Sequence, residues 1–217
     1  MRCIFCKADS SGSISEEHII PQSMGNIDHV LPRGAVCDKC NQYFSSKVEQ
    51  PLLESGLFRH IRAQMEIPSK RGRVPTWDTS DGVEKPSYRL MGRFLGKVGL
   101  EAFVLKVLAV DGWNDEVVQQ NGFDDLRRFA RFNEGTDWPF ATRTLHPVNA
   151  IFTDRGKEEH LLHEFDILLT ERSEVYSVVS LFGVELVINL GGRTLDGFRD
   201  WSTANNFTSP LYAGKNA

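Results

Sequence analysis

Two Cys-x-x-Cys pairs near the N-terminus constrain the fold of this chain more than any other feature. The chain has four cysteines, Cys3 and Cys6 in the first pair and Cys37 and Cys40 in the second. Two residues between thiolates let one tight turn present both sulfurs to one ion, and two such turns supply the four tetrahedral thiolates that zinc prefers. The pattern therefore predicts a structural Zn²⁺ site, which would stabilise a module too short to build a large core.

Disulfide bonds and a thioredoxin-like redox pair are the alternatives to this zinc site. The N-terminus, MRCIFCKADS, lacks an apolar signal-peptide core, and no run of the chain reaches the apolar length of a membrane span. We therefore expect a cytoplasmic protein with no membrane contact, in which disulfides are disfavoured. A redox pair would need one motif in a βαβ setting, whereas this chain has two motifs that flank a predicted hairpin.

The segment between the two cysteine pairs predicts two strands followed by a helix. The stretch ISEEHIIP is typical of a strand that bends at Pro21, and HVLPRGAV is typical of a second strand leading into Cys37. After Cys40 the sequence NQYFSSKVE can begin a helix. In this order, His18 on the first strand would face the start of the helix, where Asn41 emerges.

The rest of the 217-residue chain predicts an α+β fold. Apolar spacing predicts one helix over 50–65, with Pro51 in its first turn, a long helix over 88–110 and a short helix over 124–132. β-branched runs predict strands at 164–171, 175–182 and 184–192, with a hairpin closed around Gly183. We thus divide the chain into an N-terminal module (1–65), a basic loop or linker (66–88) and a C-terminal α+β domain with an antiparallel sheet (89–217).

An acidic residue, a histidine, an apolar pair and a proline, followed by Cys-x-x-Cys-Asn, together resemble the HNH endonuclease family. More narrowly, residues 3 to about 50 are similar to members whose ββα-metal fold is held by two zinc knuckles. The resemblance implies that Glu17 and Asn41 bind a catalytic divalent ion and that His18 is the general base. A sparse oxygen shell suits Mg²⁺ or Mn²⁺, and a histidine is a natural base near neutral pH. The four-cysteine zinc site has no open position, so we do not assign catalysis to it.

The sequence departs from the family pattern on the helix that carries Asn41. Many members have a second histidine about one turn later, where this chain has Ser45. Glu49, two turns from Asn41, is a candidate for the remaining ligand position. The family's middle motif is also absent from the second strand, so either His29 or a backbone carbonyl would orient His18.

A basic stretch follows the module. The chain carries a net charge of −4, but residues 59–73 are locally basic and could contact a phosphate backbone. The candidate nucleic-acid contacts are Arg59, Arg62, Lys70, Arg71 and Arg73, although a solvated helix end and loop would show the same pattern.

These observations predict a metal-dependent endonuclease that hydrolyses phosphodiester bonds of DNA, with a role in restriction or defence suggested by the family resemblance. A zinc-stapled binding module without catalysis and an RNA-directed nuclease are the alternatives, and homodimer formation stays open. Two other motifs are rejected. HLLH, with His160 and His163, leads into a strand that would separate the two rings. GRFLGK, which ends at Lys97, is one residue short of a phosphate-binding loop and lacks its Ser/Thr.

Overall fold

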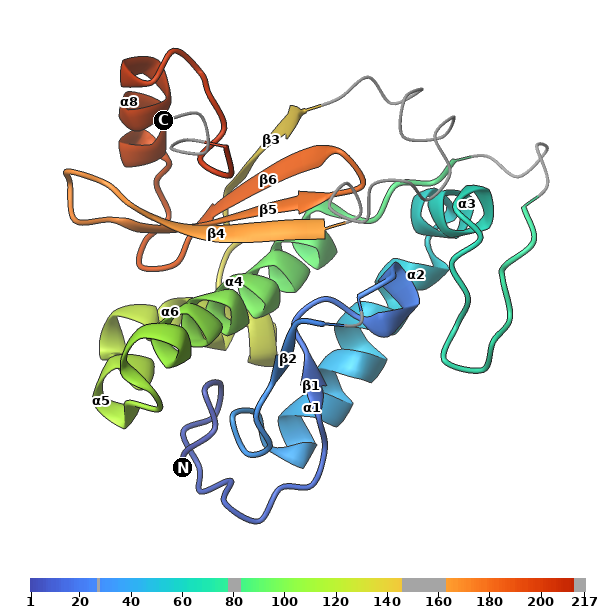
Figure 1. Ribbon diagram of the computed structural model, residues 1–217, viewed down its shortest axis with the longest axis horizontal. Helices are drawn as coiled ribbons and strands as arrows, with labels where there is room; N and C mark the ends of the chain where they lie inside the picture. Colours follow the sequence, from blue (N-terminus) through green and yellow to red (C-terminus); the bar gives the residue numbers. More distant parts are fainter. Residues whose placement is uncertain (27, 78–82, 146–162, 213–217) are drawn as a thin grey trace.

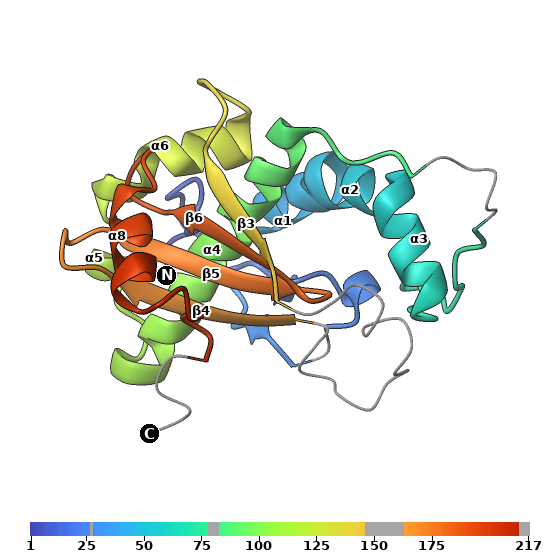
Figure 2. The same cartoon turned by 90° about the horizontal axis from the view of Figure 1, so that it is seen from above.

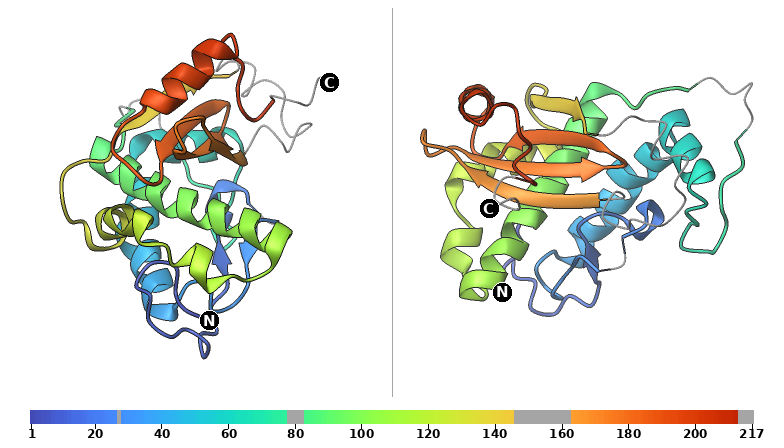
Figure 3. Two further views of the ribbon diagram at one scale, coloured as in Figure 1. Left: turned by 90° about the vertical axis from the view of Figure 1, so that its left-hand side faces the viewer. Right: turned by 45° about the horizontal axis from the view of Figure 1, so that its top comes forward.

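The computed structural model describes residues 1–26, 28–77, 83–145 and 163–212. It confirms an α+β fold with an N-terminal module and a four-stranded antiparallel sheet (Figure 1). The long helix α4 (Tyr88–Asp111) lies between them, with the sheet on one side and the N-terminal module on the other (Figures 1 and 3).

The N-terminal module contains a minimal hairpin followed by a helix. Strand β1 (Glu17–His18) pairs antiparallel with β2 (Val30–Leu31), so each strand is much shorter than expected. The buried side chain of Asn26 fixes the turn between them, because its amide donates to the carbonyls of Ile20 and His29 and accepts from two backbone amides. Helix α1 (Asp38–Phe44) then begins at the second cysteine pair and continues into the π-helical turn η2 (Ser45–Glu49).

The prediction of one helix over 50–65 is wrong at Ser55. The structure has two helices, α2 (Gln50–Glu54) and α3 (Gly56–Gln64), and Pro51 lies in the first turn of α2 as expected. Ser55 adopts extended backbone angles (φ −62°, ψ 148°), and its hydroxyl donates to the carbonyl of Leu52. This bond satisfies a carbonyl at the helix end, so the chain can turn before α3 begins.

Three glycines let α4 approach its neighbours closely. A Cβ at Gly99 would lie 2.8 Å from Leu190 and 3.0 Å from Ser177 on the sheet, and one at Gly96 would lie 2.9 Å from Leu126. A Cβ at Gly92 would lie 3.2 Å from the carbonyl oxygen of Trp138. The glycines lowered the helix propensity of the sequence, but here they are required for packing.

The sheet has the strand order β3-β6-β5-β4, with every neighbouring pair antiparallel (Figure 2). Strands β4 (His163–Leu169), β5 (Val175–Leu181) and β6 (Val184–Asn189) confirm the three predicted strands. Phe182 and Gly183 both have positive φ, which is the turn geometry that suits the twist of a tight hairpin. The edge strand β3 (Phe140–Thr144) and the helix α8 (Asp196–Ala204), which lies on the face of the sheet opposite α4, were not predicted.

Shorter elements connect these layers. They are α5 (Asp115–Val118), the 3-10 turns η1 (Gln22–Met24) and η3 (Asn121–Phe123), and α6 (Asp124–Arg127), which continues into the π-helical turn η4 (Arg128–Phe132). The described residues of the predicted loop, 66–77 and 83–87, form neither helix nor strand. In the part of the chain that the structure describes, no helix has both the length and the apolar character to cross a membrane.

One hydrophobic core runs through the module, α4 and the sheet. Phe44 of α1, Val98 of α4 and Val179 of β5 belong to the same buried cluster, as do the cysteines Cys3 and Cys40. The domain boundaries at 65 and 88 stay a prediction. The shared core means that side chains from α4 and η4 can reach the functional residues of the N-terminal module.

Candidate functional site

The four cysteines form a metal-binding cluster. Their sulfur atoms all lie within 4.8 Å of one another, and the sulfurs of Cys6 and Cys37 are 3.7 Å apart. Tetrahedral zinc with bonds of about 2.3 Å would place its ligands about 3.8 Å apart. None of the four is in a disulfide. Hydrogen bonding from Cys40 lowers the pKa of Cys3 to about 5, so a thiolate is available near neutral pH. Spacing, distance and chemistry are consistent with two zinc knuckles.

A cation from the second half of the chain supports this cluster. The Nε of Arg131, on η4, donates to the sulfur of Cys40 at 3.2 Å. The same guanidinium lies over the ring of Tyr43, 3.8 Å from its centroid. Four thiolates with one Zn²⁺ would carry a net charge of −2, so a positive charge at this position would stabilise the loaded cluster and orient one ligand.

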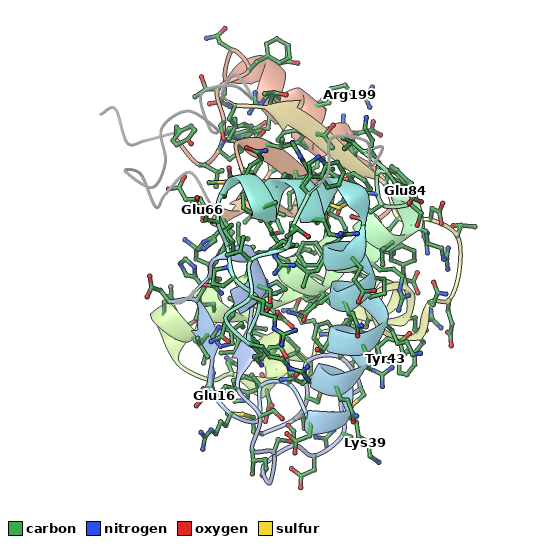
Figure 4. The ribbon with its side chains drawn as sticks, turned by 90° about the vertical axis from the view of Figure 1, so that its right-hand side faces the viewer. Glu16, Lys39, Tyr43, Glu66, Glu84 and Arg199 are labelled. Carbon is green, nitrogen blue, oxygen red and sulfur yellow. The ribbon has the colours of Figure 1, made fainter. Side chains whose placement is uncertain are left out.

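A cavity of about 270 Å³ brings most of the predicted catalytic residues together. It lies beside the hairpin and the first helices. Figure 4 labels Glu16, which lines the cavity next to β1, and Tyr43 of α1, which does not line it. Its wall includes Glu17 and His18 of β1, Asn41 of α1, Glu49 at the end of η2, Arg62 of α3 and Lys70. The carboxylates of Glu17 and Glu49, the amide of Asn41 and the imidazole of His18 thus meet two basic side chains in a single hollow, which Glu16 and Glu54 also line.

His18 is held in a state that suits a proton acceptor. Burial lowers its pKa, and the positive charges of Lys70 and Lys97 lower the pKa further. The imidazole is therefore neutral near pH 7. Its Nδ1 is buried and has no hydrogen-bond partner among the described residues. The backbone of His18 is held by Lys97, whose ammonium donates a hydrogen bond to the carbonyl of His18 at 3.0 Å.

His29, the candidate for orienting His18, lies elsewhere. Its ring packs edge-on against Phe165 of β4 at a centroid distance of 4.7 Å and against His163 at 5.7 Å. The backbone of His29 still contributes to the hairpin, since its carbonyl accepts from Ile19. His29 therefore connects the hairpin to the sheet rather than to the ring of His18.

Glu17 is almost completely buried and pairs with Lys97 of α4. Its Oε1 lies 2.7 Å from the ammonium nitrogen, which also lies 2.9 Å from Glu49 and 2.9 Å from Glu101. The same nitrogen donates to the carbonyls of His18 and Ile19, at 3.0 and 3.2 Å. Five oxygens thus surround an ammonium that is 0% exposed. Removing one partner from a buried ion pair typically costs about 3–5 kcal/mol.

The charges in this cluster act on one another. Burial alone would lower the pKa of Lys97, but attraction from the three carboxylates raises it well above the usual value. Lys97 is therefore a permanent cation. Burial raises the pKa of Glu101 well above its ordinary value, and burial also raises the pKa of Glu17, in both cases against the attraction of Lys97.

Asn41 is held by the strand that carries the acidic residue. Its Nδ2 donates to the carbonyl of Glu16 at 3.0 Å, which fixes the orientation of the amide and leaves Oδ1 as its ligand-capable atom. With Glu17 and Glu49, this amide gives a set of hard oxygen donors on the cavity wall, and such a set fits Mg²⁺ or Mn²⁺. Ser45 lies on the same wall, at the position where many family members have histidine.

The predicted basic contacts divide into two groups. Arg62 and Lys70 line the cavity. Arg62 is 7% exposed, and its Nε has no hydrogen-bond partner among the described residues. Arg59, Arg71 and Arg73 are exposed and do not line this cavity.

Local sequence patterns did not identify Lys97 and Arg131 as functional residues. The motif GRFLGK, which ends at Lys97, indicates no role for this lysine. The pattern that could have identified it is a lysine and a glutamate four residues apart inside the apolar stretch FLGKVGLEAF. Charges at this spacing lie on the same helix face, and a charged pair in an otherwise buried segment needs further partners. Arg131 gave no such signal, because its partner Cys40 lies 91 residues away in the sequence.

The rejected HLLH motif is only partly described. His163 begins β4, next to His29, and His160 lies outside the described residues. Among the described residues, the four cysteines are the only group of at least three Cys, His, Asp or Glu side chains placed to hold a metal ion.

Comparison with known proteins agrees with this geometry for the N-terminal part. Residues 3–56 match the model of a family described as HNH endonuclease. No curated protein and no solved structure matches the chain. The match includes both cysteine pairs and the residues of the hairpin and α1 that line the cavity, but it ends before α4. Residues 3–56 of this chain are therefore similar to the HNH endonuclease family.

Proposed function

We propose that this protein is a metal-dependent endonuclease that hydrolyses phosphodiester bonds of DNA. The observation that carries the proposal is the cavity wall itself, on which Glu17, His18, Asn41 and Glu49 meet Arg62 and Lys70. A base, a set of hard oxygen ligands and two cations are the parts that hydrolysis of a phosphodiester requires.

Each residue has a separate task in this mechanism. His18, neutral near pH 7, accepts a proton from the attacking water. Glu17, Asn41 and Glu49 would hold a divalent ion, which would supply Lewis-acid stabilisation to the phosphate and the leaving oxygen. Arg62 and Lys70 bind the negatively charged phosphate, and the unpaired Nε of Arg62 is a donor ready for this contact. The four-cysteine cluster would hold Zn²⁺, which would fix the ends of the module.

The direct test is incubation of the purified protein with supercoiled plasmid in divalent-free buffer and with added Mg²⁺ or Mn²⁺. We expect cleavage only with the added ion. Single-stranded DNA and RNA of matched length, assayed in parallel, test the RNA-directed alternative. If no nucleic acid is cut with either ion although the protein binds it, the protein is a binding module instead.

The ligand assignment predicts a specific change in metal dependence. Replacing Glu17 or Glu49 by glutamine, or Asn41 by alanine, removes one ion ligand each. We expect each variant to need a higher Mn²⁺ concentration for half-maximal cleavage, by about 10-fold or more, since one ligand or its support typically contributes that much. Gln42→Ala, next to Asn41 on the exposed side of α1, is the matched control. If the Glu49 variant has the same ion dependence as the wild type, Glu49 is not a ligand and water fills that coordination position.

The exposed basic residues predict a change in nucleic-acid affinity. Replacing Lys70, Arg71 and Arg73 by alanine should weaken binding to all DNA sequences alike, because these side chains contact phosphates. The slope of log K against log salt should become shallower by roughly 0.9 for each lost contact. The control replaces Arg128, Arg172 and Arg199, which are exposed and paired with aspartates away from the cavity. Equal salt slopes in both triple variants would mean that Lys70, Arg71 and Arg73 do not contact the phosphate backbone.

A further inference from the structure

Lys97 is a fully buried charge that the proposed mechanism does not use. It comes from α4, outside the matched residues 3–56, yet its ammonium touches two of the proposed ion ligands. Within the described residues, Glu101 and two backbone carbonyls complete its surroundings. A fully buried lysine is rare unless it is paired, and this one connects α4 to two residues of the cavity wall.

The geometry assigns Lys97 as a positioning residue for the ion site, and this inference rests on the proposed function. The ammonium binds Oε1 of Glu17 and Oε1 of Glu49, at 2.7 and 2.9 Å. Because both carboxylates also line the cavity, each can present its second oxygen to the ion while the first is held from behind. Outer partners of this kind fix the orientation of metal ligands and tune their affinity.

Lys97 also acts on the backbone beside the base. Its bonds to the carbonyls of His18 and Ile19 tie the end of β1 to α4. The hairpin itself has only two residues in each strand, so its own ladder restrains this segment weakly. One side chain therefore sets the relative positions of two ligands and the base.

The position of Glu101 explains how the site tolerates the lysine. Glu101 is completely buried on α4, four residues from Lys97, and it does not line the cavity. It offsets part of the charge of the ammonium from a position outside the cavity wall. The positive charge that remains close to Glu17 and Glu49 opposes tight capture of a divalent ion, and it prevents both carboxylates from closing around the ion with all four oxygens.

The inference predicts that ion affinity and catalytic rate change in opposite directions. Lys97→Met alone leaves three carboxylates, two of them buried, without their cation, so the principal variant is Lys97→Met with Glu101→Gln, which removes one charge of each sign. Freed from the ammonium, Glu17 and Glu49 should bind Mn²⁺ more tightly. Cleavage of plasmid at saturating Mn²⁺ should fall by roughly 10- to 100-fold, because the ligands and the base are no longer held.

The experiment measures Mn²⁺ binding by titration of the free-ion electron spin resonance signal, next to cleavage, zinc content and DNA binding. Lys106→Met is the control, because it is the same substitution on the same helix at a half-exposed lysine paired with Asp166. The control should match the wild type in all four measurements. The double variant should retain its zinc and DNA binding while ion affinity rises and rate falls.

Two results would overturn the inference and leave the proposed function standing. If the wild type cuts DNA and the double variant has the same ion affinity and rate, Lys97 only neutralises Glu101. If zinc content and DNA binding fall together with ion affinity and rate, Lys97 maintains the fold instead of positioning ligands. A wild type that neither binds Mn²⁺ nor cuts would remove the proposed function and this inference with it.

Discussion

Replacing His18 by alanine is expected to lower the rate of plasmid cleavage by about 10²- to 10⁴-fold, the usual contribution of a positioned general base. The structure gives the reason, because the lowered pKa of His18 keeps its ring neutral and its side chain lies on the cavity wall. Zinc content, thermal stability and DNA affinity should be unchanged, since a base acts only in the chemical step. The measurement is single-turnover cleavage at saturating Mg²⁺ or Mn²⁺.

His29→Ala is the control for this prediction. The residue lies in the same hairpin, but its ring packs against Phe165 and not in the cavity. We expect its cleavage rate to stay within a few-fold of the wild type. Equal rates for His18→Ala and the wild type would mean that another group accepts the proton, and a large loss in His29→Ala would return this histidine to the site.

Cys37→Ser is expected to abolish tight zinc binding and to destabilise the whole chain. Metal analysis of the wild type should give about one zinc per chain. Structural zinc in small modules contributes about 10–16 kcal/mol of apparent binding free energy, which is folding free energy for the module. Since the cysteines share a core with α4 and the sheet, a net loss of roughly 5 kcal/mol would lower the melting temperature by about 10–20 °C.

Lys39→Ala provides the matched control, because this lysine is exposed on α1 two residues from Cys37 (Figure 4). Its zinc content and melting temperature should equal those of the wild type. A well-folded wild type without zinc, or a Cys37→Ser variant of unchanged stability, would contradict the zinc assignment. Scanning calorimetry together with metal analysis by mass spectrometry decides between these results.

Local patterns in the sequence predicted most of the fold, and tertiary contacts decided the rest. The three β-branched runs are strands and the long apolar segment is α4, because their periodicity is strong. β3 was missed because FATRT is short and polar at an edge of the sheet. The break at Ser55 was missed because helical spacing continues across it, while one side-chain hydrogen bond to Leu52 favours an extended residue.

The candidate site divides in the same way. Residue spacing in the sequence predicted the cysteine pairs and the stretch around His18 as sites, since such sites require residues that are close in sequence. The partners Lys97 and Arg131 lie far along the chain from Glu17 and Cys40. Contacts of that range depend on how α4 and η4 pack, which no local pattern contains. The sequence therefore predicted the residues proposed to act in chemistry or metal binding, but not the residues that hold them in place.

The absent side chains of α4 have a consequence for how the cavity could change during evolution. Gly96 and Gly99 let the helix lie close to α6 and the sheet, and Lys97 stands between them in sequence. A single methyl group added at Gly99 would collide with the sheet. The collision would displace α4, together with the ammonium of Lys97, relative to the hairpin. The absence of side chains at Gly96 and Gly99 thus determines how closely the ammonium of Lys97 approaches Glu17. A relative could retune its dependence on divalent ions by changing a glycine that touches neither ion nor nucleic acid.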